Sequence, residues 1–161
     1  MIVVELPGDP RGKGRPRSRV VRTTKGIPFV AVYTDAQTRA YEKALGMMAK
    51  VAMRGRPLLT GPLAVEIIAL FAVPKSWPNK KRDAALADIV RPTGSPDCDN
   101  IQKIALDALN GIVFPDDSQV VEIRASKCYS EKPRLRIEIK PLEAQLFHHD
   151  ERTADGAALA G

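Results

Sequence analysis

The sequence predicts an α/β fold of the α+β type, in two layers, with a mixed β-sheet covered on one face by two main helices. Three observations support this prediction. The chain has 161 residues, a length that suits one domain with a sizeable core. Hydrophobic residues make up 44% of it and charged residues 27%, as in folded water-soluble domains. Strand-like segments occur before, between and after two amphipathic helical segments, so both helices can pack on one side of a sheet.

Five segments have strand character. Residues 62–73 are rich in β-branched side chains, which predicts a central strand. Residues 133–141 alternate apolar and polar side chains, as a strand with one buried face does. The sequence Ser-Glu-Lys-Pro at 130–133 is compatible with a hairpin turn between the last two strands. The expected strands cover residues 2–6, 28–34, 62–73, 118–129 and 133–141.

The first helical segment follows Asp35, which has the position of an N-cap, and ends before Gly55 and Pro57. A connector at residues 74–96 contains four prolines, with one or two helical turns expected at 83–90.

The second helix, expected at residues 99–112, has an apolar and a polar face. Apolar side chains recur at helical spacing and predict a stripe that faces the sheet. These residues are Ile101, Ile104, Ala105, Ala108, Leu109 and Ile112. Asp99, Lys103 and Asp107 fall on the opposite side, and we expect Asp107 to be solvated rather than paired. Leu106 lies within this polar face and suggests a partner surface.

The folded domain is expected at residues 1–142, with a disordered tail at 143–161 that is polar and rich in small residues. The two cysteines are too few for a disulfide framework, which indicates a reducing compartment. No signal peptide is visible, and no apolar run approaches the ~20 residues that a membrane helix needs. We therefore expect a cytoplasmic protein without a membrane partner.

The chain is basic, with a net charge of +6 and a pI of about 9.5, which favours a polyanionic partner such as nucleic acid. Residues 10–26 carry seven basic side chains and no acidic one, in a loop or irregular ribbon. A solvated run of charge is the alternative explanation. The candidate DNA contacts are Arg11, Lys13, Arg15, Arg17, Arg19, Lys80, Lys81, Arg82 and Lys127. Trp77 could stack on an unpaired base, but packing at the sheet edge is the favoured interpretation.

Acidic residues gather at two places around the second helix. Asp97 and Asp99 lie at its start, where acids cap helices and where Asp99 could form an ordinary ion pair with Lys103. Asp116 and Asp117 follow the helix in a sequence that suits a turn. A strand beginning near residue 118 could run beside the long strand and return Asp117 to the helix N-terminus. The clustered carboxylates would then need a cation, and Mg²⁺ prefers such oxygen ligands.

From Pro96 to Lys127 the chain resembles the RusA family of Holliday-junction resolvases. The shared pattern is D-x-D-N-x-x-K, then L-D-A-L, then D-D-S-Q-V-V, then a lysine ten residues beyond Asp117. This match covers about a fifth of the chain, and its residue types, order and spacing all agree. The basic, Gly/Pro-containing N-terminal segment is also similar in character.

The resemblance implies a RusA-like fold and a homodimeric, Mg²⁺-dependent endonuclease that nicks four-way DNA junctions symmetrically in recombination and repair. Mn²⁺ is expected to be able to replace Mg²⁺, and no nucleotide cofactor is expected. Catalytic roles are assigned to Asp97, Asp99, Lys103 and Asp117. The three aspartates are the expected metal ligands, with Asp116 as a further candidate.

Two other functions compete with this one. A non-catalytic basic module that binds DNA junctions would use the aspartates only as caps and turns. A Mg²⁺-dependent phosphotransferase acting on a small nucleotide is less well supported, because the sequence has no P-loop or Rossmann glycine pattern. The number of carboxylates favours the nuclease, since a simple binding module does not need them and they would repel its DNA unless a metal ion were present.

Overall fold

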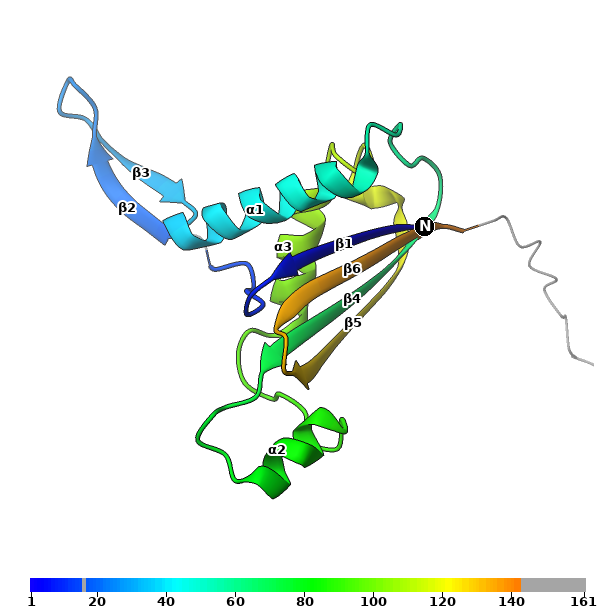
Figure 1. Cartoon of the computed structure of the whole chain (residues 1–161). Helices are drawn as coiled ribbons and strands as arrows, with labels where there is room; N and C mark the ends of the chain where they lie inside the picture. Colours follow the sequence, from blue (N-terminus) through cyan, green and yellow to red (C-terminus); the bar gives the residue numbers. More distant parts are fainter. Residues whose placement is uncertain (16, 143–161) are drawn as a thin grey trace, which may run out of the picture.

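The computed structural model describes residues 1–15 and 17–142 and has the expected two layers (Figure 1). One layer is a four-stranded sheet in the order β1-β6-β4-β5, built from β1 (Ile2–Pro7), β4 (Leu63–Ala72), β5 (Val120–Ser130) and β6 (Arg134–Pro141). Helices α1 (Ala36–Met53) and α3 (Cys98–Leu109) form the other. The expected mixed sheet is confirmed, since β4 pairs in parallel with β5 and antiparallel with β6.

Both long helices cover the same face of the sheet. The five residues of the apolar stripe that lie in α3 are buried, and Leu45, Ala49 and Met53 of α1 join most of them in one core cluster. The helix ends at Leu109, earlier than expected, so Ile112 lies beyond it and is half-buried. The sheet contributes alternate residues to this cluster, including Ile67 of β4 and Ile137 of β6, each with no exposed surface. Burial of these facing stripes is the main force that holds the two layers together.

The expected hairpin between the last two strands is wrong. The strand β4 lies between β5 and β6, so these two strands do not pair with each other. The short turn after Ser130 instead crosses the end of β4. Leu135, Ile137 and Ile139 of β6 have no exposed surface. An interior position, with neighbours on both sides, gives these side chains cover that an edge strand would not.

Two elements stand outside the layers. Strands β2 (Arg17–Arg22) and β3 (Pro28–Tyr33) form a separate antiparallel ribbon that projects from the body (Figure 1). Helix α2 (Asn79–Leu86) lies beyond the end of the sheet where β4 finishes and begins earlier than expected. Trp77, just before it, packs edge-on against Tyr129 of β5 with a centroid distance of 5.2 Å, so the packed interpretation of Trp77 is confirmed. The predicted tail at residues 143–161 lies outside the described residues.

The buried centre of β4 predicts a large loss of stability on truncation. Ile67→Ala should lower the free energy of unfolding by about 2–5 kcal/mol, because it removes buried methyl groups and leaves a cavity. Ile89→Ala is the control, since Ile89 is 78% exposed and its loss should change stability by no more than about 0.5 kcal/mol. Chemical denaturation followed by circular dichroism measures both, and equal effects would contradict the assignment of β4 to the core.

Candidate functional site

The first acidic pair lies at the start of α3, where it is exposed. Asp97 has the N-cap position, yet its side chain makes no capping hydrogen bond. Asp35 at the start of α1 behaves differently, because its Oδ1 accepts from the Thr38 backbone N–H at 3.0 Å. Capping therefore explains Asp35 but not Asp97, and the Asp97 carboxylate is available for another role.

Asp99 and Lys103 face solvent one helical turn apart. The Lys103 Nζ lies 3.3 Å from Asp99 Oδ2, and both side chains are 63% exposed. An exposed pair at this spacing contributes only a few tenths of a kcal/mol. The ion pair is weak enough for either partner to exchange it for a metal ion or a phosphate oxygen.

Two expectations about the polar face of α3 are wrong. Leu106 is half-buried and packs against the core, so it does not mark an exposed partner surface. Asp107 is not merely solvated, since its Oδ2 lies 2.7 Å from the Nζ of Lys13. Helical periodicity could not detect this contact, because Lys13 comes from a loop far away in the sequence.

The N-terminal basic loop is fastened to the same helix. The backbone N–H of Lys13 donates to the Asn100 carbonyl at 2.8 Å. At Gly12, a Cβ atom would lie 2.8 Å from the Cβ of Pro96 and 2.9 Å from that of Asn100, so any larger residue would displace the loop. The loop therefore lies directly beside the start of α3.

Lys13 joins three elements through its charge. Its Nζ contacts Glu42 of α1 at 2.6 Å as well as Asp107 of α3. Partial burial lowers the pKa of Lys13, but the hydrogen bonds that it donates to Asp107 and Glu42 outweigh burial and raise the pKa above its ordinary value. The attraction is therefore present at neutral pH and is lost only as pH rises through the raised pKa. Lys13 therefore fastens the basic loop to both helices, and its contact with DNA stays a prediction.

The other predicted basic residues fall into two groups. Arg15, Lys80 and Lys81 are exposed, although the Lys81 Nζ also lies 3.8 Å from the centre of the Trp77 ring. Arg11 donates to the neutral side chain of Gln37 at 2.9 Å and keeps its charge unpaired in this contact. Two more make contacts within the chain: Arg19 lies near the Tyr33 ring, and Arg82 donates to the Pro74 carbonyl. The side chain of Arg17 lies outside the described part of the structure.

Lys127 has a role that sequence reasoning missed. It is half-buried on β5, and its Nζ donates to the carbonyl oxygens of Gly94 at 2.7 Å and Pro96 at 3.1 Å. These two carbonyls belong to the segment that leads into Asp97. Lys127 thus holds the segment before α3 in place. In the sequence, only its spacing from Asp117 within the family pattern singled this lysine out.

The second acidic pair lies at the other end of β5. Asp116 caps a short 3₁₀ helix, η1 (Asp117–Gln119), by accepting from the Ser118 N–H at 2.9 Å. Hydrogen bonds from the Ser118 side chain and backbone lower the pKa of the Asp116 carboxyl below its ordinary value. Asp117 is exposed and makes no ion pair with the described residues. Asp116 therefore stabilises the turn, whereas the exposed carboxylate of Asp117 is available to a partner outside the chain.

The expected meeting of Asp117 with Asp97 and Asp99 within one chain is wrong. Strand β5 does run beside β4, as expected, but in parallel, with Val120 opposite Leu63 and Ser130 opposite Ala72. The start of α3 is tied to Lys127, near the far end of β5. The extended chain from 120 to 127 therefore puts Asp117 on the order of 20 Å from that start. Accordingly, the described residues contain no group of three or more potential metal-binding side chains.

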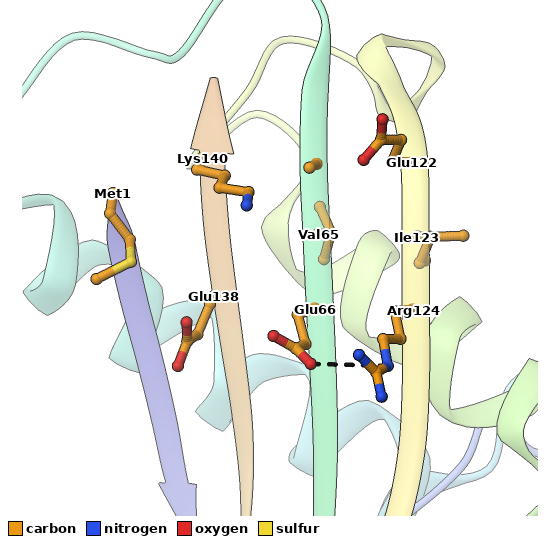
Figure 2. Close-up of a pocket in the computed structure, with 9 residues that line it drawn as sticks. Met1, Val65, Glu66, Glu122, Ile123, Arg124, Glu138 and Lys140 are labelled. Carbon is orange, nitrogen blue, oxygen red and sulfur yellow. Dashed lines mark ion pairs between the residues drawn. The ribbon is translucent and has the colours of Figure 1, made fainter. Parts of the chain in front are cut away.

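Two hollows differ in their relation to these acids. One of about 550 Å³ lies on the helix-free face of the sheet, where Glu66 and Arg124 approach to 3.9 Å (Figure 2). Its lining carries both signs of charge, and it is on the opposite side of the sheet from α3 (Figure 2). The other, of about 370 Å³, lies between the basic loop and the start of α3 and is lined by Arg11, Arg15 and Asn100 among others. Of these two hollows, only the second is lined by the chain neighbours of Asp97 and Asp99, which are Pro96 and Asn100.

Fold and site together define a basic α+β domain that exposes carboxylates beside a cationic loop, an arrangement suited to metal-assisted chemistry on phosphodiesters. The chain belongs to the RusA endodeoxyribonuclease family, because the model of that family, Endodeoxyribonuclease RusA, matches residues 7–140. It is also similar to the uncharacterized protein YqaN of Bacillus subtilis (strain 168), with 37% identity over 141 residues that cover 85% of this chain and 94% of that protein. Within the described part of the chain, no helix has the length and apolar character of a membrane span.

The contacts of Lys127 predict that its loss will loosen the segment before Asp97. In Lys127→Met, amide hydrogen exchange of residues 94–99 should accelerate about tenfold or more, because the loss of two charge-assisted hydrogen bonds exceeds ~1.4 kcal/mol. Lys132→Met is the matched control, since Lys132 is an exposed lysine in the turn after β5. Unchanged exchange in Lys127→Met would show that the segment holds its shape without the lysine.

Proposed function

We propose that this protein is a Mg²⁺-dependent endodeoxyribonuclease that resolves Holliday junctions by paired symmetric nicks, in DNA recombination and repair. The observation that carries the proposal is the uncapped, exposed pair Asp97 and Asp99 at the start of α3, beside a basic loop, in a member of the RusA family. A domain that only bound DNA would gain nothing from acids facing the phosphates.

Asp97 and Asp99 fit a magnesium ion by their chemistry. Both offer carboxylate oxygens, both are exposed, and the Asp97 carboxylate makes no capping bond. Mg²⁺ commonly takes one or two protein carboxylates and keeps several waters, and Mn²⁺ accepts the same ligands. When bound there, the ion would supply an acidified water as nucleophile and offset charge on the leaving oxygen.

Lys103 is suited to stabilise the transition state. It projects from the same face of α3 as Asp99, one turn along, and only an exposed ion pair restrains it. An ammonium in that position would contact a non-bridging phosphate oxygen, where negative charge grows during attack. Arg11 and Arg15, which line the adjoining hollow, would hold flanking phosphates.

Asp117 would complete the site from a second copy of the chain. Within one chain, β5 separates it from Asp97 by on the order of 20 Å. In a two-fold symmetric dimer, the η1 turn of one subunit can approach the start of α3 in the other, and symmetry then produces two equivalent sites. Two such sites match the near two-fold symmetry of a four-way junction, which accounts for paired nicks.

A mixing experiment tests the shared site. Asp99→Asn and Asp117→Asn proteins should each be inactive alone, but a mixture allowed to exchange subunits should recover cleavage. In a mixed dimer, one site carries both substitutions and the other carries neither, so every mixed dimer has one intact site. If the site were formed within a single chain, no mixture would recover activity. A mixture of Asp97→Asn with Asp99→Asn is the control and should stay inactive, since both changes lie on the same side of the site.

Cleavage itself is tested with a labelled four-way junction and a linear duplex of the same sequence. Wild-type protein should nick only the junction and only with Mg²⁺ or Mn²⁺. Lys103→Gln should lower the cleavage rate at saturating metal by about 10²–10³-fold, as expected for a lost transition-state contact. A Lys103→Gln rate near wild type would limit Lys103 to holding Asp99, and junction binding without cleavage by wild-type protein would favour the binding module.

A further inference from the structure

The β2–β3 ribbon, the pair of strands from Arg17 to Tyr33, presents an apolar face that no described residue of the chain covers. It pairs with no strand of the main sheet and stands clear of the body (Figure 1). In its register, Val20 lies opposite Val30, and Val32 follows on the same face two residues along. These valines are 70%, 63% and 68% exposed, respectively. Contiguous apolar surface of this kind indicates a binding partner.

The charge around this face selects the partner. From Pro10 to Thr34 the chain carries seven lysines and arginines and no acidic residue. A second copy of the ribbon would meet it with the same charge and be repelled. A polyanion satisfies both features at once, because its phosphates attract the cations and its bases offer apolar faces.

The ribbon is rooted at the candidate site. Its first strand follows the loop in which Lys13 bonds the Asn100 carbonyl at the start of α3. Its second strand ends two residues before Asp35, which caps α1. Six-residue strands give the ribbon a length of about 20 Å. The ribbon is therefore longer than the DNA major groove is wide, which is ~12 Å. DNA held at Asp97 and Asp99 would therefore come within reach of the valine face.

We propose that the valine face of the ribbon packs against unstacked bases at the branch point of a DNA junction, while the ribbon's cations hold the flanking phosphates. In a continuous duplex the base faces are covered by stacking and only polar edges remain in the grooves. At a branch point the stack is interrupted, and apolar side chains can occupy the gap as they do in proteins that kink DNA. The ribbon thus distinguishes a junction from a duplex, an inference that rests on the proposed function.

The test uses a junction with 2-aminopurine at the branch point, since this base fluoresces more strongly when it is unstacked. Protein carrying Asp99→Asn is used throughout, so that no cleavage is needed. We expect it to raise the fluorescence of the junction but not of a linear duplex. Adding Val20→Thr, Val30→Thr and Val32→Thr keeps the β-branched shape and strand preference but makes the face polar. This should abolish the fluorescence rise and weaken junction binding about tenfold or more, with duplex binding unchanged within about threefold.

The matched control is Val51→Thr, because Val51 is a valine on α1 with a similar exposure of 67%. It should leave fluorescence and binding unchanged.

Circular dichroism melting checks that the triple threonine variant folds. A Val20→Ala, Val30→Ala and Val32→Ala protein keeps an apolar face with shorter side chains, and it should give an intermediate rise in fluorescence. A full fluorescence rise with the triple threonine variant overturns the proposal. The proposal is also overturned if the triple threonine variant has a changed mass in solution but still raises the fluorescence, because the valine face would then be a protein interface. Failure of the nuclease proposal would appear separately, as wild-type protein that opens the junction without cutting it.

Discussion

The parallel pairing of β4 with β5 sets the positions of the two acidic pairs in this protein. Parallel strands require a crossover, and α3 supplies it by running back across the sheet, so its start lies near the end of both strands. Lys127 reaches from β5 to the segment before Asp97 and fastens that end. The same geometry sends Asp117, which precedes β5, to the opposite end. The proposed site would therefore be divided by the fold, and the two-fold dimer that we propose would reunite its parts.

A second constraint joins the cationic part of the chain to the acidic part. Gly12 allows the basic loop to lie against Pro96 and Asn100, and Lys13 bridges Glu42 and Asp107. Each contact is modest, but together they tie the loop to both helices and direct the β2–β3 ribbon from a fixed root. Cationic side chains and carboxylates are thereby brought to the same end of α3.

The charges of the molecule divide into paired and available groups. On the helix-free face of the sheet, Arg136 contacts Glu5 at 2.6 Å and Glu138 at 2.7 Å, which leaves that face nearly neutral. The exposed charges near the start of α3, Asp97, Asp99 and Lys103, are held loosely or not at all. Groups that must exchange partners during a reaction need such weak restraint, whereas groups that support the fold do not.

The sequence by itself determined every described strand except β2, whose residues were expected in a loop or irregular ribbon. It also determined the two long helices, the buried and polar faces of α3 and the residues of the acidic pairs, because these follow from local periodicity and from a short, specific pattern. It also indicated the family, which the match over residues 7–140 then established. Only the tertiary structure decided that β4 separates β5 from β6, that Lys13 and Lys127 support the fold, and that Asp117 lies far from Asp97. Strand order and contacts such as that of Lys13 with Asp107 join residues distant in the chain. They arise from the packing of whole elements against one another, which local sequence patterns do not encode.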